Sequence, residues 1–508
     1  MDWTVRRFQV YALGTGLLTL LLIAANFPLL DVPYYWDEIG QFIPASLDLY
    51  EHGALVPRTT LPNIHPPGLM AYLAGVWRLT GYSVRATRVA MLLIAGAALL
   101  ACFLLAVELA KPWNAAPPFF VISILFCSPL FHAQAPLAHL DLPAMLFTTM
   151  ALVAFIRDHP RAAALASTAL VLTKETGILV PAVFGAWLFA EHRRREAAWF
   201  LLPAAALAAW VLWLWVATGN PFGNREFAEY NLLWPLHPVR LAGNLARRLW
   251  FLLVADFHWI GVICVAIALR RTEAFRGRAW AVSATLLGAH ILLMSAVGGA
   301  MLERYLLPAL AILYIAIAVA WREIRGRRIR TVVQMAMLFG MVGSYVFNPP
   351  YPFAFENNMA WTDFVMLQAA AAGYLQTHFP DARIASAWPF TDALRRPEFG
   401  YVARPLARQP LADFTRPSLV SLKAHPPDIF VLYLRTWDPP GSVLSLRPAR
   451  DWLARWYGWR PDVKGGDIDA ELGFRRLRRW DSRGQWIEVY ARPGLKVPSG
   501  ALERSGHR

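Results

Sequence analysis

The stretch NIHPPGLMAYLAGVWRLTG, residues 63–81, decides how the chain is threaded through a membrane. From Pro66 to Gly81 it is apolar apart from Arg78, yet it is shorter than the roughly 20 residues that a helix needs to cross a bilayer. Pro66 suits the start of a helix, because proline fits the first helical turn. We therefore expect a helix that lies against the membrane and does not cross it.

Arginine clusters elsewhere in the chain support this interpretation. If residues 66–81 do not cross, all of these clusters share one side of the membrane with Arg6 and Arg7, namely 157–161, 193–195, 270–278 and 322–330. Basic loops usually stay on the cytoplasmic side, and with this threading every cluster follows that positive-inside rule. If the stretch did cross, these clusters would face the opposite side and the rule would fail repeatedly. The N-terminus is therefore expected in the cytoplasm of a cell that carries the chain in its inner (plasma) membrane.

Composition assigns the chain to the multi-pass membrane proteins. Of its 508 residues 57% are hydrophobic and 16% charged, against roughly 45–50% and 25% in soluble proteins. The net charge of +15 resides mostly in clusters between apolar spans, which favours membrane anchors over a nucleic-acid surface. Eleven spans are expected, near 8–30, 89–110, 117–131, 140–156, 161–173, 176–190, 197–217, 249–269, 279–298, 305–321 and 331–347.

A soluble domain is expected after the last span. Prolines at 349, 350 and 352 mark a linker. Beyond it the pattern predicts a helix over 361–378, strands over 383–387, 428–434 and 486–490, and a helix near 450–456. Such alternation favours an α/β domain over residues 349–492, which eleven crossings place outside the cell. Residues 493–508 are expected to be a disordered tail, and residues 1–348 form the transmembrane domain.

The first external loop carries the acidic pair Asp37 and Glu38 after Tyr34, Tyr35 and Trp36. Interfacial aromatics and a solvated acidic pair would be ordinary at a membrane edge. The placement of two carboxylates directly after a span favours a functional role, because the aromatic side chains could hold a sugar ring there.

Two further polar positions lie on the same external face. His65 precedes two prolines and either ends a loop or contacts a phosphate or a carboxylate. Asp141 lies where a span begins, so capping of the helix is at least as well supported as chemistry.

Charged residues also interrupt apolar stretches. Lys174 and Glu175 either neutralise each other at a turn between two short helices or provide a cation for a lipid phosphate. Glu303, Arg304 and Tyr305 follow two glycines, and the Arg304 guanidinium suits phosphate better than simple snorkelling to the interface. Together these charges predict one external cavity.

Other motifs give no further site. Asp467, Ile468 and Asp469 form a DxD pattern beside Gly465 and Gly466, which is more typical of a solvated turn than of a metal site. No phosphate loop, dinucleotide fingerprint, HExxH or paired CxxC occurs. We expect neither a metal nor another cofactor.

The ordered set of motifs resembles a known family. In sequence they are Asp37-Glu38, HPP at 65–67 with GYS at 81–83 and Arg88, LDLP at 140–143, LTKETG at 172–177 and ERYLLP at 303–308. Together they are similar to glycosyltransferase family 39, which includes protein O-mannosyltransferases and lipid A aminoarabinose transferases. The resemblance covers about residues 1–350, and AWP at 387–389 with GYV at 400–402 extends it into the last domain.

This resemblance implies a C-type glycosyltransferase fold and a polyprenyl-phosphate sugar as donor. It implies that Asp37 is the catalytic base, Glu38 its neighbour and Asp141 a second acid of the cavity. It places Lys174, Arg304 and Tyr305 at the lipid-phosphate site. His65 stands where some members have a lysine, which leaves open the donor-phosphate contacts and which sugar is carried.

The implied reaction is an inverting displacement at the anomeric carbon. A carboxylate takes the proton of the acceptor hydroxyl, and fixed cations stabilise the leaving phosphate. The acceptor is a protein, a lipid or a glycan outside the cell, and the remaining partners are membrane lipids. The alternative is a transporter or flippase of a lipid-linked or small anionic substrate, which predicts internal repeats and charges spread through the bilayer.

Overall fold

The computed structural model describes residues 3–111, 118–498 and 500–501. The chain divides into two compact units. The helical unit comprises Met1–Phe27, Gln41–Phe347 and Glu356–Asn358, and the sheet unit comprises Pro28–Gly40, Asn348–Phe355 and Met359–Arg508. The division near 348 lies where the linker was expected. Two short segments depart from it, because Pro28–Gly40 belongs to the sheet unit and Glu356–Asn358 to the helical unit.

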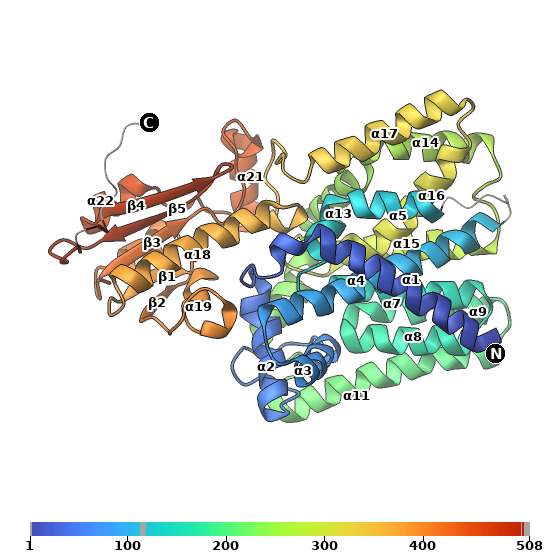
Figure 1. Ribbon diagram of the computed structural model, residues 1–508, viewed down its shortest axis with the longest axis horizontal. Coiled ribbons are helices and arrows are strands. Elements are labelled where there is room, and N and C mark those ends of the chain that lie inside the picture. The colour runs from blue at the N-terminus through green and yellow to red at the C-terminus, as the bar shows by residue number, and fades with distance from the viewer. Residues whose placement is uncertain (1–2, 112–117, 499, 502–508) are drawn as a thin grey trace. The chain divides into compact units, whose positions relative to one another are not determined.

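The helical unit is built from α-helices joined by short turns, and α1, α4, α7 and α8 lie side by side in it (Figure 1). Its α-helices are α1 (Trp3–Ala25), α2 (Ile43–His52), α3 (Gly68–Thr80), α4 (Val84–Ala110), α5 (Pro118–Cys127), α6 (Pro129–Gln134), α7 (Asp141–Ile156), α8 (Pro160–Thr173), α9 (Leu179–Ala190), α10 (Arg194–Ala197), α11 (Leu201–Thr218), α12 (Arg225–Ala228), α13 (Pro238–Leu253), α14 (His258–Arg271), α15 (Arg278–Ala296), α16 (Leu307–Arg322) and α17 (Arg327–Gly343). Short 3-10 or π segments lie between them, including η2 (Glu38–Phe42), η4 (Glu175–Ile178), η8 (Ala255–Phe257) and η9 (Glu303–Leu306).

Several of these helices are long and apolar enough to cross a membrane. Among the described residues four qualify singly, namely Val84–Ala110, Arg194–Thr218, Arg278–Ala296 and Glu303–Arg322. A bent pair, Pro238–Leu253 with Ala255–Arg271, makes a fifth. Shorter apolar helices cover Gln9–Ala25, Asp141–Ile156 and Glu175–Ala190. The chain is thus a multi-pass helical membrane protein, and eleven crossings remain a prediction.

The expected span over 249–269 has the wrong bounds. A helix, α13, begins already at Pro238, in the stretch between the expected spans 197–217 and 249–269. The break falls at Asp256 and Phe257, whose φ angles of 51° and 63° are left-handed. A right-handed helix needs negative φ angles, so it cannot continue through these two residues. Non-glycine residues rarely adopt the left-handed conformation. The two helices meet there with a bend of 47°.

Helix α3 is the element that decided the threading. Its 13 residues span about 20 Å at 1.5 Å per residue, well short of the roughly 30 Å hydrocarbon core. Two side chains tie it to α4, because Trp77 Nε1 donates to Thr87 Oγ1 over 3.0 Å and Tyr72 Oη donates to the Ala90 carbonyl over 2.9 Å. This helix is too short to cross the hydrocarbon core by itself, and its position against the membrane stays a prediction.

The sheet unit contains one mixed five-stranded sheet in the order β2-β1-β3-β5-β4. The pairs β1–β2 and β1–β3 are parallel, whereas β3–β5 and β4–β5 are antiparallel. The long helix α18 lies along the sheet (Figure 1). The strands are β1 (Ile384–Ala387), β2 (Arg408–Leu411), β3 (Ile429–Tyr433), β4 (Arg475–Ser482) and β5 (Gln485–Ala491). The helices are α18 (Ala360–His378), α19 (Phe390–Ala393), α20 (Arg416–Ser421), α21 (Arg447–Tyr457) and α22 (Gly465–Leu472).

The sequence predicted α18, α21 and the strands β1, β3 and β5, but not the two strands at the sheet edges. Strand β4 reads RRLRRWDS, so its arginines conceal the apolar alternation of a strand. The DxD pattern was expected in a solvated turn, which is wrong, because Asp467 and Asp469 lie within α22. Asp467 Oδ2 accepts from the Lys464 backbone N–H at the start of that helix.

Part of the expected disordered tail over 493–508 lies outside the described residues, namely 499 and 502–508. Ala501 is described, and its carbonyl accepts a hydrogen bond from Tyr374 Oη over 2.6 Å.

Candidate functional site

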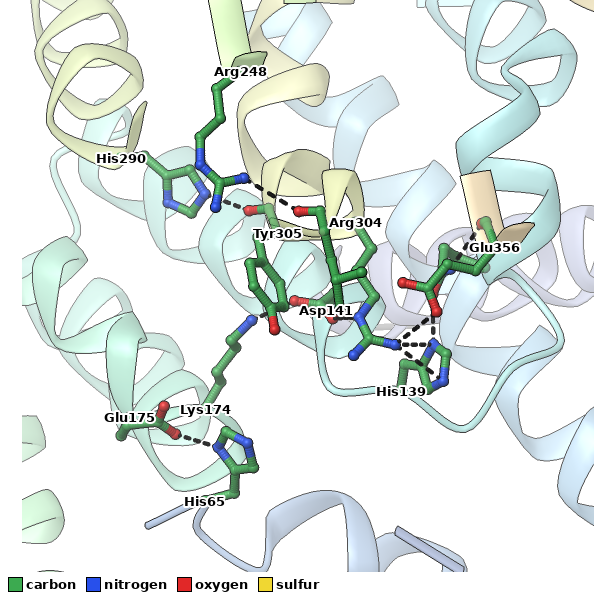
Figure 2. Close-up of polar contacts among 12 residues, drawn as sticks. His65, His139, Asp141, Lys174, Glu175, Arg248, His290, Arg304, Tyr305 and Glu356 are labelled. Carbon is green, nitrogen blue, oxygen red and sulfur yellow. Dashed lines mark hydrogen bonds and ion pairs between the residues drawn. The ribbon is translucent and has the colours of Figure 1, made fainter. Parts of the chain in front are cut away.

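Arg304 is the centre of a buried charge cluster in the helical unit (Figure 2). It lies in η9, directly before α16, and only 3% of it is exposed. Its Nε lies 3.1 Å from Asp141 Oδ2, and its Nη1 lies 3.1 Å from Glu356 Oε2. Asp141 begins α7, and Glu356 comes from the short segment that follows α17 and the linker. Three distant parts of the chain therefore meet at one guanidinium.

His139 completes the surroundings of Arg304 and is fully buried. Its Nδ1 lies 2.8 Å from Gln134 Oε1, and Arg304 Nη1 lies 3.0 Å from its Nδ1 and 3.2 Å from its Nε2. A guanidinium only donates, so it needs an unprotonated ring nitrogen as its acceptor. Burial, followed by the positive charges of Arg304, Arg88 and Lys174, holds the pKa of His139 well below its ordinary value. The neutral ring therefore agrees with the hydrogen bonds.

Lys174 approaches the same cluster from the break between α8 and η4. Its Nζ donates to Asp141 Oδ1 and lies 4.3 Å from the centroid of the Tyr305 ring. Asp141 thus holds Lys174 with one oxygen and Arg304 with the other. Helix capping was one of the two roles considered for Asp141, and the structure does not have it, because Leu140 occupies the N-cap position and Asp141 is the first residue of α7. Its carboxylate binds two cations and does not cap the helix.

Arg248 of α13 is a third buried cation at Tyr305, with 3% of its surface exposed. Its guanidinium carbon lies 5.7 Å from the Tyr305 ring centroid, as does that of Arg304. Its Nε donates to the Met294 carbonyl over 2.8 Å and its Nη1 to the Leu302 carbonyl over 3.2 Å. Within the described part of the chain, its buried Nη2 has no hydrogen-bond acceptor. This geometry leaves one donor for an anion.

Lys174 and Glu175 do form the expected break between two helices, but they do not neutralise each other. Glu175 Oε2 lies 2.8 Å from His65 Nδ1, whereas Lys174 binds Asp141. His65 therefore contacts a carboxylate, one of the roles considered for it, next to the residue that carries the lysine.

Glu303, next to Arg304, helps to hold the segment 356–358, to which Glu356 belongs. Its Oε1 accepts from Arg247 Nε over 2.7 Å and its Oε2 from Asn357 Nδ2 over 2.9 Å. Gln134 Nε2 donates to the Glu356 carbonyl over 3.1 Å. Residues 356–358 are thus fixed within the helical unit by side chains and backbone together.

Asp37 and Glu38 belong to the sheet unit. Asp37 is half-buried at the start of the helical run that continues through η2 into α2. Glu38 is fully buried, and its Oε2 accepts from the Tyr35 backbone N–H over 2.7 Å. Its carboxylate therefore closes the turn that carries Asp37.

The structure brings together Asp141, Lys174, Arg304 and Tyr305, with the His65–Glu175 pair beside Lys174 (Figure 2). The sequence reasoning missed His139, Arg248 and Glu356. Arg248 belongs to a basic pair in a stretch expected to be loop, and Glu356 lies in an expected linker. The described residues contain no group of three or more His, Cys, Asp or Glu side chains that could hold a metal ion.

The protonation of His139 predicts a specific pH dependence of stability. The unfolded chain binds a proton at His139 near its ordinary pKa of about 6.5, whereas the folded chain does not. The free energy of unfolding therefore decreases as the pH falls below about 6.5, by up to ~1.4 kcal/mol per pH unit for this group. In His139→Gln this part of the loss should vanish, which thermal unfolding of the wild type and variant between about pH 5 and about pH 7.5 will measure. An identical pH dependence in both proteins would contradict a neutral His139.

Removal of Glu356 should leave an uncompensated cation. In Glu356→Ala we expect a loss of about 3–5 kcal/mol in the free energy of unfolding, because one partner of a buried ion pair is deleted. Glu356→Gln should lose less, since its amide oxygen still accepts from Arg304. The control is Glu229→Ala, which breaks the exposed pair with Arg225 and should leave the stability nearly unchanged. Equal melting temperatures for Glu356→Ala and the control would show that the pair contributes nothing.

Comparisons with known proteins address the fold. No protein-family model and no curated protein matches the sequence. The structure is similar to that of ArnT from Cupriavidus metallidurans bound to undecaprenyl phosphate, with a TM-score of 0.52, 13% identity, and 94% of this chain and 99% of that one covered. The apo state of the same protein gives a TM-score of 0.50 at 14% identity, with 92% and 97% covered. The archaeal oligosaccharyltransferase AglB from Archaeoglobus fulgidus gives 0.48 at 10% identity, with 98% and 76% covered. The chain therefore has the same fold as these two ArnT structures.

Proposed function

We propose that this chain is a membrane glycosyltransferase that transfers a sugar from a polyprenyl-phosphate donor to an acceptor outside the cell. The observation that carries the proposal is the gathering of three buried cations, Lys174, Arg248 and Arg304, around the Tyr305 ring. Buried cations are costly unless they are paired, so a surplus of them indicates a site for an anion. The similarity in fold to an ArnT structure bound to undecaprenyl phosphate supports a lipid phosphate as that anion.

The charges around Tyr305 favour a phosphate group. Two carboxylates, Asp141 and Glu356, bind Lys174 and Arg304. Arg248 binds only carbonyl oxygens and presents a donor without an acceptor among the described residues. A guanidinium matches the geometry of phosphate oxygens, so Arg248 is the proposed direct contact, together with Lys174. His65 contacts Glu175, the residue after Lys174, and so is linked to this group indirectly.

In the proposed reaction Asp37 takes the proton from the acceptor hydroxyl. The hydroxyl oxygen then bonds to the anomeric carbon while the bond from this carbon to the phosphate oxygen breaks, which inverts the configuration. The polyprenyl phosphate leaves with an additional negative charge, and fixed cations stabilise this charge more in the transition state than in the donor. Asp141 keeps two of these cations in place, and Glu38 closes the turn that presents Asp37. Since a monophosphate has less charge to neutralise than a nucleotide diphosphate, we propose that these side chains suffice without a metal.

The finer assignments follow from the sequence. We propose eleven crossings, a cytoplasmic N-terminus in the plasma membrane and a sheet unit outside the cell. The acceptor is a hydroxyl of a protein, a lipid or a glycan.

Arg248 should contribute directly to donor binding. In Arg248→Gln we expect the dissociation constant of undecaprenyl phosphate to rise about 10-fold to 150-fold, the equivalent of one charge-assisted hydrogen bond of about 1.5–3 kcal/mol. Titration of the lipid into the purified protein in nanodiscs measures this constant. Arg225→Gln, at an exposed pair, is the control and should bind as the wild type does. Equal affinities for both variants would remove Arg248 from the phosphate site.

Asp37→Asn tests the transfer itself. Loss of the general base should lower the rate of transfer about 10²-fold to 10⁴-fold, while donor binding persists. Transfer of radiolabelled sugar from synthetic polyprenyl-phosphate donors to a membrane extract measures the rate in proteoliposomes. Asp381→Asn, at an exposed carboxylate, is the control and should transfer normally. Unchanged transfer by Asp37→Asn would exclude Asp37 as the base, and movement of intact donor across the membrane without release of sugar would favour a flippase.

A further inference from the structure

The turn that carries Asp37 is held by residues of the sheet unit. The Tyr34 backbone N–H donates to the Phe399 carbonyl over 3.3 Å, and Tyr401 Oη donates to the Tyr34 carbonyl over 2.7 Å. Residues 399–401 follow β1 and α19 in the same unit. The turn is therefore bonded to the domain that begins more than 300 positions later in the chain.

Trp36, directly before Asp37, has an unusual backbone conformation. Its φ angle of 38° lies in the left-handed region, which a bulky residue rarely adopts because it is strained there. Such a conformation persists only where the surroundings enforce it. The Trp36 ring lies 5.4 Å from the Phe364 ring and 4.9 Å from the Trp388 ring, which it meets edge to face.

Trp388 also contacts the backbone on the other side of Asp37. A Cβ atom placed on Gly40 would lie 2.9 Å from Trp388 Cζ2, closer than real Cβ contacts. The indole therefore fills the space beside Gly40 and at the same time supports the ring of Trp36. One side chain of the sheet unit touches both flanks of the turn.

We propose that Trp388 is a positioning residue for Asp37, which rests on the proposed role of Asp37 as the base. By packing against Trp36 and Gly40, the indole holds the left-handed turn and fixes the direction of the carboxylate. Glu38 holds the same turn from within through the Tyr35 N–H. Proton transfer needs a carboxylate within hydrogen-bond reach of the acceptor hydroxyl, so a small misplacement lowers the rate strongly. The sheet unit thus takes part in the proposed catalysis by positioning Asp37.

Trp388→Ala should separate the rate of transfer from the binding of the donor. We expect kcat to fall about 10-fold to 100-fold while the KM for the polyprenyl-phosphate donor changes little, because the phosphate contacts belong to the helical unit. Trp388→Phe keeps an aromatic ring and should restore most of the rate. Trp480→Ala is the matched control, because Trp480 is also half-buried in the sheet unit but packs on Tyr374. It should leave kcat unchanged.

Gly40→Ala tests the same contact from the other side. Its methyl group should lower kcat in the wild-type background, where it meets the indole, and have little effect in Trp388→Ala, where the indole is gone. Independent effects of the two substitutions would overturn the proposal. So would a fall in donor affinity that accounts for the whole loss of activity.

Hydrogen exchange gives a readout that does not depend on the reaction. Amides of residues 34–40 should exchange faster in full-length Trp388→Ala than in Trp480→Ala, since the turn loses its support. Equal exchange in the two variants would overturn the positioning role. If exchange rises as expected but Asp37→Asn transfers normally, then the assignment of Asp37 as the base fails, while the mechanical support by Trp388 stands.

Discussion

Burial of the Arg304 guanidinium is the constraint on which the helical unit depends. A cation with 3% of its surface exposed cannot rely on water, so protein groups must supply its partners. Asp141, His139 and Glu356 do so from the start of α7, the turn before it and the segment after the linker. Each partner lies at a helix end or in a turn, where the backbone can change direction. The interruptions in the apolar helices are therefore what allows the cluster to assemble.

The same cluster holds the cations in the arrangement that the proposed phosphate site needs. Lys174 and Arg304 share Asp141, so the carboxylate fixes two positive groups with one negative charge. Arg248 is held by carbonyl oxygens, which orient it without cancelling its charge. Preorganised cations need no rearrangement when charge develops on a leaving group, and this is the main source of electrostatic catalysis. Structural support and the proposed chemistry thus use the same atoms.

The sequence predicted the parts of this cluster that stand out locally. Asp141, Lys174 and Arg304 interrupt apolar stretches, where a charge is costly and therefore conspicuous. Arg248 and Glu356 escaped, because one belongs to a basic pair before an expected span and the other to a proline-rich segment. The roles of these two residues depend on contacts with residues far away in the sequence. The break at Asp256 and Phe257 escaped for the same reason, since nothing in the composition of 249–269 requires a left-handed turn.

The two groups of proposed catalytic side chains are held by different forces, and the proposed chemistry explains the difference. Asp141 binds Lys174 with one oxygen and Arg304 with the other, and these ion pairs fix the positions of both cations, which is its proposed task. A general base needs a carboxylate held in a fixed direction. Around Asp37 the sheet unit provides aromatic packing on Trp36 and Gly40 and hydrogen bonds to the backbone of Tyr34. These contacts hold the turn through its neighbours, so the backbone that presents the carboxylate is rigid.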